Sequence, residues 1–98
     1  MHEPDNTFLY VIGVSETGPV KIGYSKFPEK RVKQLQTGQA EKLKLFYSEA
    51  VTPSEARRIE KQIHDTNRYL RTRGEWFNIP VKEAIEEVNF GLRSDSEI

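Results

Sequence analysis

The segment Thr7–Gly13 is apolar on both of its faces, and this pattern constrains the fold more than any other feature of the sequence. The faces alternate along the segment, with Phe8, Tyr10 and Ile12 on one and Leu9 and Val11 on the other. A strand rich in β-branched and aromatic residues on both faces has to be covered on both sides, which predicts a position in the middle of a sheet. Turn-forming residues 15–18 follow, and residues 20–24 are predicted to return as its partner in a β-hairpin.

Proline and one capping motif mark the helices. Pro28 suits the first turn of a helix that Gly38 ends, and the alternation in residues 43–48 predicts a third strand. Residues 52–55, with the sequence TPSE, form a capping box with proline at the first helical position, so a second helix begins there. Residues 74–79 are predicted to form a short extended segment.

Pro80 then opens a last helix with its apolar residues on one face. The predicted core positions of the three helices are Val32, Leu35, Ala56, Ile59, Ile63, Val81, Ala84, Ile85, Val88 and Leu92. The predicted order is β-β-α-β-α-(β)-α, an α+β domain with a small three-stranded antiparallel sheet flanked by helices. The expected boundaries are one domain over residues 1–98, a core at about 7–80, a C-terminal helix at about 81–92, and frayed ends at 1–6 and 93–98.

Composition removes several classes of function. With 98 residues the chain has room for one domain, and the absence of cysteine excludes disulfides, thiolate nucleophiles and Cys-ligated zinc. Its longest apolar run, residues 9–14, is too short to span a bilayer, and no secretory signal is evident. We therefore expect a cytoplasmic protein without a membrane partner.

The charges are balanced overall but segregated along the chain. Fifteen Lys and Arg offset fifteen Asp and Glu, which on its face argues against binding nucleic acid. Residues 21–73, however, carry thirteen positive and six negative side chains, a net charge of +7, while the flanks carry −7. Such a basic stretch can attract phosphates, the alternative being a set of solvated helix faces.

Lys21 is the first candidate for chemistry, because it points away from its neighbours Val20 and Ile22 and shares a hairpin with Tyr10. An ammonium near a phenol favours the phenolate, so we expect the pKa of Tyr10 to fall towards that of a usable general base. The alternative is a lysine at a sheet edge beside a core tyrosine.

Glu60 is the sharpest candidate, since it lies at the shoulder of the apolar stripe of the second predicted helix. A partly desolvated carboxylate is costly unless it is paired or holds a cation, and a single-carboxylate site suits Mg²⁺ with water and phosphate as further ligands. The alternative is an ion pair with Arg57 or Lys61.

Two further residues stand out by position. Arg31 lies in the first turn of its predicted helix, where the dipole disfavours a cation unless an anion binds beside it; a solvated arginine is the alternative. His64 follows Glu60 by four residues and faces the same side, although a lone histidine more often has a structural role.

The order and spacing of these residues resemble the GIY-YIG nuclease superfamily. The positions that carry the resemblance are Phe8-Leu9-Tyr10, Lys21-Ile22-Gly23, Tyr24, Arg31 and Glu60. It is closest to a small stand-alone branch, common in phages and bacteria, with KIG as second triplet, a Glu…His pair and a GEWF segment, here residues 74–77. The likeness covers about residues 7–80, and the β-β-α-β-α core of that family agrees with the predicted order. Phe8-Leu9 stands in place of Gly-Ile, and Lys21 in place of tyrosine.

What the resemblance implies is hydrolysis of DNA phosphodiester bonds with one divalent ion, Mg²⁺ or Mn²⁺. The implied roles are activation or relay of the attacking water by Tyr10, orientation of that water by Lys21, contact with the scissile phosphate by Tyr24, stabilisation of its charge by Arg31, metal binding by Glu60 and an auxiliary role for His64. We expect these side chains to converge on one concave surface.

DNA is thus the expected partner, and the basic middle supplies candidate phosphate contacts. The predicted nucleic-acid-binding residues are Lys26, Lys30, Lys33 and Arg57. The resemblance includes no appended recognition region, so a homodimer or a separate recognition partner would supply specificity. A non-catalytic nucleic-acid-binding module on the same fold is the main alternative. A protein–protein adaptor that uses residues 76–77 as its interface anchor is a further one.

Overall fold

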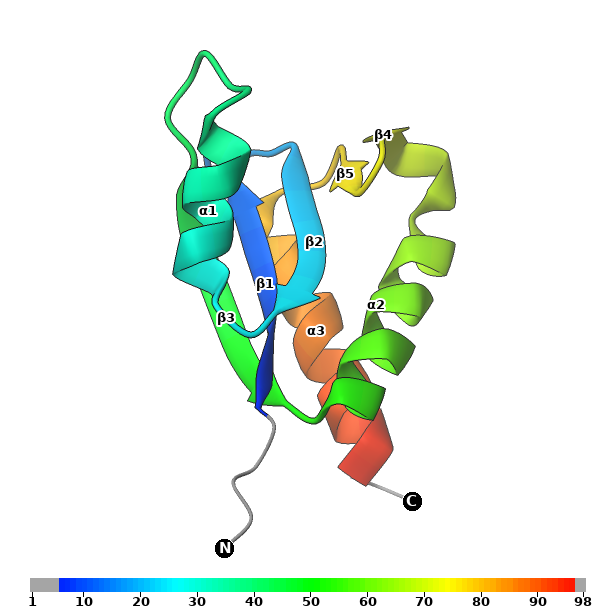
Figure 1. Cartoon of the computed structure of the whole chain (residues 1–98). Coiled ribbons are helices and arrows are strands. Elements are labelled where there is room, and N and C mark those ends of the chain that lie inside the picture. The colour runs from blue at the N-terminus through cyan, green and yellow to red at the C-terminus, as the bar shows by residue number, and fades with distance from the viewer. Residues whose placement is uncertain (1–5, 97–98) are drawn as a thin grey trace, which may run out of the picture.

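The computed structural model describes residues 6–96, and Figure 1 shows how its elements are arranged. The elements in chain order are β1 (Thr7–Gly13), β2 (Val20–Ser25), α1 (Pro28–Gln36), β3 (Lys44–Val51), α2 (Pro53–Thr66), a 3₁₀ turn (Arg68–Leu70), β4 (Arg71–Arg73), β5 (Trp76–Phe77) and α3 (Val81–Ser96). The α+β class, the β-hairpin, the third strand and the three helices are confirmed.

The sheet has five strands in the order β3-β1-β2-β5-β4, all antiparallel, so the predicted three-stranded sheet is wrong. The first three strands are those predicted, with β1 in the middle. The other two extend the sheet beyond β2 through the pairs Val20–Phe77 and Lys21–Trp76. Three exposed polar residues and a two-residue strand carry too little apolar alternation to mark a sheet in the sequence. β5 becomes a strand by pairing with β2, and β4 by pairing with β5.

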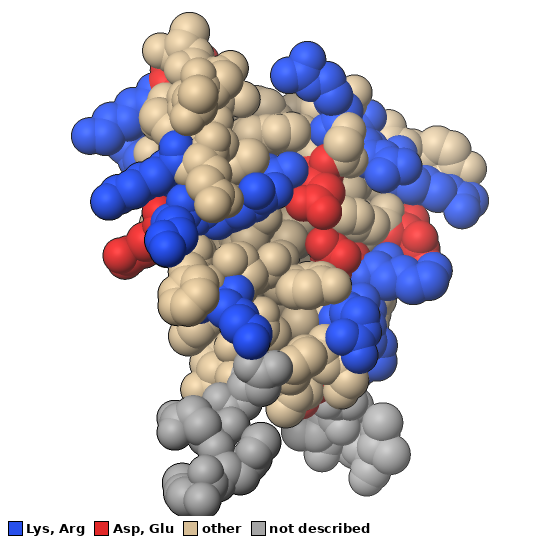
Figure 2. Space-filling model, viewed as in Figure 1, with Lys and Arg blue, Asp and Glu red and all other residues tan. Residues whose placement is uncertain are grey.

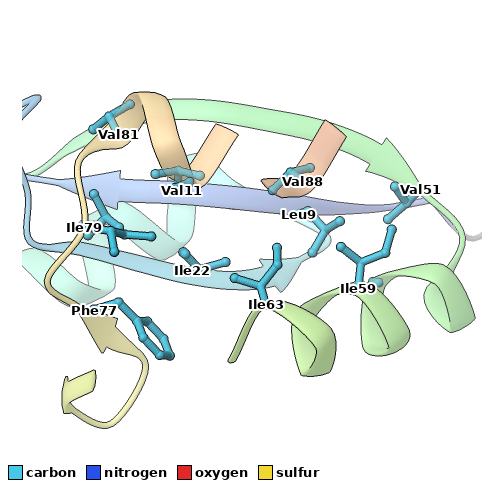
Figure 3. Packing of buried hydrophobic residues seen from close by; sticks show 13 residues of the cluster. Leu9, Val11, Ile22, Val51, Ile59, Ile63, Phe77, Ile79, Val81 and Val88 are labelled. Carbon is cyan, nitrogen blue, oxygen red and sulfur yellow. The ribbon is translucent and has the colours of Figure 1, made fainter. Parts of the chain in front are cut away.

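Each face of the sheet has its own helical layer. α2 and α3 cover the face that carries Leu9 and Val11, and their core residues interdigitate with the strands as Figure 3 shows. The main core comprises Leu9, Val11, Val20, Ile22, Val51, Ala56, Ile59, Ile63, Phe77, Ile79, Val81, Ala84 and Val88. α1 covers the opposite face, where a smaller cluster is built on Tyr10, Ile12 and Leu43 (Figure 1). The predicted stripe of α2 is confirmed, and Val81, Ala84 and Val88 of α3 are buried as predicted. The other predicted helical core residues are only partly buried: Val32, Leu35, Ile85 and Leu92.

Local chemistry fixes the ends of the elements. The capping box is formed, with the Glu55 amide donating to the Thr52 hydroxyl and the Thr52 amide donating to the Glu55 carboxylate. Gly18, in the turn between β1 and β2, has a φ of +88° and lies so close to the Ile79 carbonyl that a Cβ there would collide with it. Next to it the Val81 amide donates to the Glu16 carbonyl at 2.9 Å, so the turn holds the start of α3.

One of the two boundary predictions for the chain ends differs from the structure. α3 continues to Ser96, past its predicted end near residue 92, so residues 93–96 belong to a helix and not to a frayed end. Of the other predicted frayed end, residues 1–5 lie outside the described residues. Within residues 6–96 no helix has the length and apolar character to cross a membrane.

The packing of α2 against α3 and the sheet should contribute strongly to stability. Ile59 is fully buried, and its side chain lies against Gly91 of α3, so Ile59→Ala is expected to lower the free energy of unfolding by about 2–5 kcal/mol through lost packing and a cavity. Urea denaturation measures this change. Lys61→Ala on the exposed side of α2 is the control and should change stability by no more than about 0.5 kcal/mol. Equal effects of the two substitutions would contradict the packing described here.

Candidate functional site

Lys21 lies on β2, at the position where this strand pairs with β1 on one side and with β5 on the other. It is paired in register with Ile12 of β1 and with Trp76 of β5, so its side chain lies on the α1 face of the sheet. It is only 8% exposed, and its ammonium lies 3.3 Å from Oε1 of Glu75. A buried ammonium needs such a partner, so the ion pair fixes the place of Lys21.

Tyr10 lies on the same face, because it is paired with Gly23, two residues after Lys21. Its ring is buried, and Nε of Arg31 donates a long hydrogen bond of 3.5 Å to its hydroxyl oxygen. A Cβ at Gly23 would lie 2.7 Å from that oxygen and 2.9 Å from Oε1 of Glu75. Glycine at this position therefore lets the phenol and the carboxylate approach the backbone of β2.

The expected fall in the pKa of Tyr10 is wrong in direction. Burial raises the pKa of the phenol, and the charge of Glu75 raises it further, against an opposing effect of Arg31. Lys21 does not offset burial, because its charge is taken up by Glu75. Tyr10 is therefore a neutral hydrogen-bonding phenol at neutral pH and not a ready-made base.

Glu60 comes from α2, on the other helical layer, and meets the cluster at the open edge of β2. Burial raises the pKa of its carboxyl, and Glu75 raises it further by repulsion and hydrogen bonding. His64 and Lys21 act in the opposite direction through their charges. The ion pair considered from sequence, with Lys61, is not formed, since Lys61 pairs with Asp65 at 3.0 Å.

His64 has a structural contact at the edge of the site. Its Nε2 donates to the carbonyl oxygen of Ile22 at 3.0 Å, and its ring packs on Phe77 with centroids 4.7 Å apart. β5 pairs only with the first two residues of β2, so this imidazole occupies part of the edge that β5 leaves open. The hydrogen bond commits one ring nitrogen to the backbone.

Tyr24 is separated from the cluster by the pleat of β2. It is paired with Leu9 and is 37% exposed, on the face opposite to Lys21. It makes no hydrogen bond to Tyr10, Lys21 or Arg31 within the described residues, so its contact with a phosphate stays a prediction.

Basic side chains surround the cluster on the surface. Figure 2 shows Lys and Arg over α1 and over α2 and the segment after it, with acidic groups between them. The four predicted nucleic-acid contacts are all exposed: Lys26, Lys30 and Lys33 at or beside α1, and Arg57 on α2. Basic side chains that are far apart in the sequence thus lie on either side of acidic groups on this face.

Glu75 is the site residue that the sequence analysis missed. It touches Lys21, lies beside Glu60 and approaches Gly23, so it joins the two helical layers of the site. The available signal was its place in the GEWF segment, where the one charged residue adjoins two aromatic residues that continue the sheet. Only the pairing of β5 with β2 brings it to Lys21.

The donor set suits a hard cation. Glu60 and Glu75 offer carboxylate oxygens, which Mg²⁺ and Mn²⁺ prefer, and these ions take water and phosphate for their other ligands. Within residues 6–96 no group of three or more His, Cys, Asp or Glu side chains is arranged to hold a metal. The residues therefore fit a site of few protein ligands and not a closed cage.

Comparison with known proteins gives one family. The sequence model of the T5orf172 domain, a nuclease-type domain, matches residues 7–91 and so includes every residue of the cluster. No curated protein and no solved structure matches the chain significantly.

The Lys21–Glu75 pair should be measurable as a coupling. In a double-mutant cycle with Lys21→Met and Glu75→Gln, we expect a coupling of about 1 kcal/mol, because the lysine is buried while the carboxylate is 39% exposed. Urea denaturation of the four proteins gives the value. Additivity of the two substitutions within about 0.3 kcal/mol would mean that the pair does not hold the site together.

The ionised carboxylate of Glu60 should lower the free energy of unfolding at neutral pH. Its pKa is raised by folding, so above the raised value the native state bears an unfavourable ionised carboxylate, and below the unfolded value near 4.5 both states are protonated. Glu60→Gln is therefore expected to raise the melting temperature at pH 7 in EDTA, and the gain should vanish below pH 4.5.

Glu41→Gln, in an exposed loop, is the matched control for loss of one negative charge. A stability gain for Glu60→Gln that persists unchanged below pH 4.5 would show that burial of the ionised carboxylate is not its cause.

Proposed function

The chain belongs to the T5orf172 domain family, and from this premise we propose that it is a metal-dependent DNA endonuclease with a one-metal, GIY-YIG-like mechanism. A nuclease-like or DNA-binding module is the coarser function that the family supports. The observation that carries the proposal is that Lys21 of β2 and Glu60 of α2 both meet Glu75, with Tyr10 and Arg31 beside them. A structural core has no need of this costly arrangement of charges.

The chemistry is addition of water across a phosphodiester bond. The water oxygen forms a new bond to phosphorus and gives up a proton to a base or to solvent. The bond to the leaving oxygen breaks and that oxygen takes up a proton from solvent, so the products are a phosphate monoester and an alcohol. Tyr10 is a neutral phenol and orients the water by hydrogen bonding. It does not act as the general base that its nearness to Lys21 led us to expect.

Arg31 stabilises the charge that builds up on the phosphate. Its contacts are the Tyr10 hydroxyl at 3.5 Å and the Gln34 side chain at 3.4 Å, and neither of these is a carboxylate that would neutralise it. A guanidinium that contacts only neutral groups retains its capacity for bidentate binding of phosphate. Its place beside Tyr10 would put phosphate and water against the same ring.

Glu60 and Glu75 would hold the metal ion. When bound, Mg²⁺ or Mn²⁺ neutralises charge on the phosphate and on the leaving oxygen. Burial and then the charge of Glu75 raise the pKa of Glu60, and a bound cation would favour its ionised form. Lys21 keeps Glu75 in place and offsets part of the negative charge of the pair.

A non-catalytic DNA-binding module is the second candidate. It is favoured by the small number of metal-ligating side chains, since no group of three occurs in the described part of the chain. Both functions would use the same basic side chains, so only a test of DNA cleavage distinguishes them.

The decisive test is nicking of supercoiled plasmid with Mg²⁺ or Mn²⁺. We expect wild type to nick, and Glu60→Gln and Arg31→Ala each to reduce the rate by at least about 100-fold, the usual cost of removing a charge-stabilising group. Gel electrophoresis of relaxed and supercoiled forms measures the rates.

Glu41→Gln and Arg93→Ala are the matched controls, because both residues are exposed and lie outside the cluster. Absence of nicking by wild type, with DNA binding intact and unaffected by Glu60→Gln, would favour the non-catalytic module. Equal nicking by wild type and both site variants would place the reaction elsewhere.

A further inference from the structure

A groove of about 540 Å³ lies beside the site, between the start of α1 and the strands β1 and β3. Its apolar lining comes from Phe8, Phe27 and Leu45, and its basic lining from Lys26, Lys30 and Lys33. Glu29 is the one acidic residue of the lining, so the groove is net positive. Three of the four nucleic-acid contacts predicted from sequence thus surround one apolar surface.

Phe27 is unusually exposed for an aromatic side chain in this setting. It precedes α1 and leaves 63% of its surface in solvent, although the smaller core on the same side of the sheet is close by. The ammonium of Lys30 lies 5.6 Å from the centroid of its ring. An exposed ring accompanied by lysines combines a stacking surface with charges for phosphates, as in proteins that bind single-stranded nucleic acid.

The groove adjoins the site along β1. Phe8 and Tyr10 are two residues apart on the same face, so they lie about 7 Å apart along the strand. A DNA strand advances about 3.4 Å per nucleotide in a duplex, so this separation corresponds to one or two nucleotides. A strand whose phosphate lies at Tyr10 and Arg31 would therefore bring a neighbouring base to Phe8 and so into the groove that Phe8 and Phe27 both line.

We propose that this groove binds an unpaired base of the substrate strand, next to the phosphate that is cleaved. The inference rests on the proposed action on DNA and specifies its substrate as DNA with a single-stranded or distorted stretch. In an intact duplex the bases are stacked inside, and phosphates alone would need the lysines but not the exposed ring. Charge complementarity with the three lysines selects a nucleic-acid strand over an apolar peptide.

Binding in EDTA separates this inference from catalysis. Fluorescence anisotropy measures the affinity of the protein for a labelled single-stranded oligonucleotide and for the matched duplex at one salt concentration. Phe27→Ala is expected to weaken single-strand binding roughly tenfold and duplex binding less than about twofold, because one base loses its stacking partner. Phe27→Trp keeps an aromatic ring at this position and should retain the single-strand affinity of wild type.

Tyr69→Ala is the matched control variant. Tyr69 is 86% exposed and has Arg68 5.0 Å from its ring, so it is a second exposed aromatic with a cation, but it lies outside the groove. Its removal should change single-strand affinity less than about twofold. Equal losses for the two alanine variants, or equal weakening of single strand and duplex by Phe27→Ala, would overturn the inference.

The possible failures are distinct. A selective loss of single-strand binding in Phe27→Ala supports the groove even when wild type does not nick plasmid, in which case only the nuclease proposal fails. Nicking by wild type with unchanged binding in Phe27→Ala overturns the groove and leaves the nuclease proposal standing. No binding to either DNA at low salt contradicts both.

Discussion

β1 is buried on both of its faces under different helical layers, and most of the architecture depends on this requirement. Leu9 and Val11 need α2 and α3, whereas Tyr10 and Ile12 need α1. Each face makes its own core, and the apolar surface buried in each offsets the loss of chain entropy. The functional cluster begins on the α1 face of the two interior strands β1 and β2, where Tyr10 and Lys21 are buried.

The cluster forms where the two layers meet at an incomplete edge. β5 pairs with the first two residues of β2 and leaves the rest of that edge open, while Glu75, just before β5, reaches Lys21. Glu60 reaches the same point from α2, and Arg31 reaches Tyr10 from α1. The contributing side chains come from β1, β2, α1, α2 and the turn between β4 and β5, so packing between these elements sets their relative positions.

The charge distribution has a cost that the fold tolerates. Glu60 and Glu75 lie close enough for repulsion and burial to raise the pKa of Glu60, and Lys21 compensates only in part. Carboxylates under such repulsion are suited to a cation, and the basic side chains on either side are suited to phosphates. The balanced formal charge of the chain conceals this separation, which Figure 2 shows on the surface.

The sequence by itself determined the elements whose signals are local. Two apolar faces located β1, the capping box located the start of α2, and the hairpin signal put Lys21 and Tyr10 in neighbouring strands. Only the tertiary structure decided β4 and β5, the role of Glu75 and the direction of the Tyr10 pKa. These depend on which distant segments meet, since two-residue strand pairing, desolvation and ion pairing arise from contacts between residues far apart in the chain.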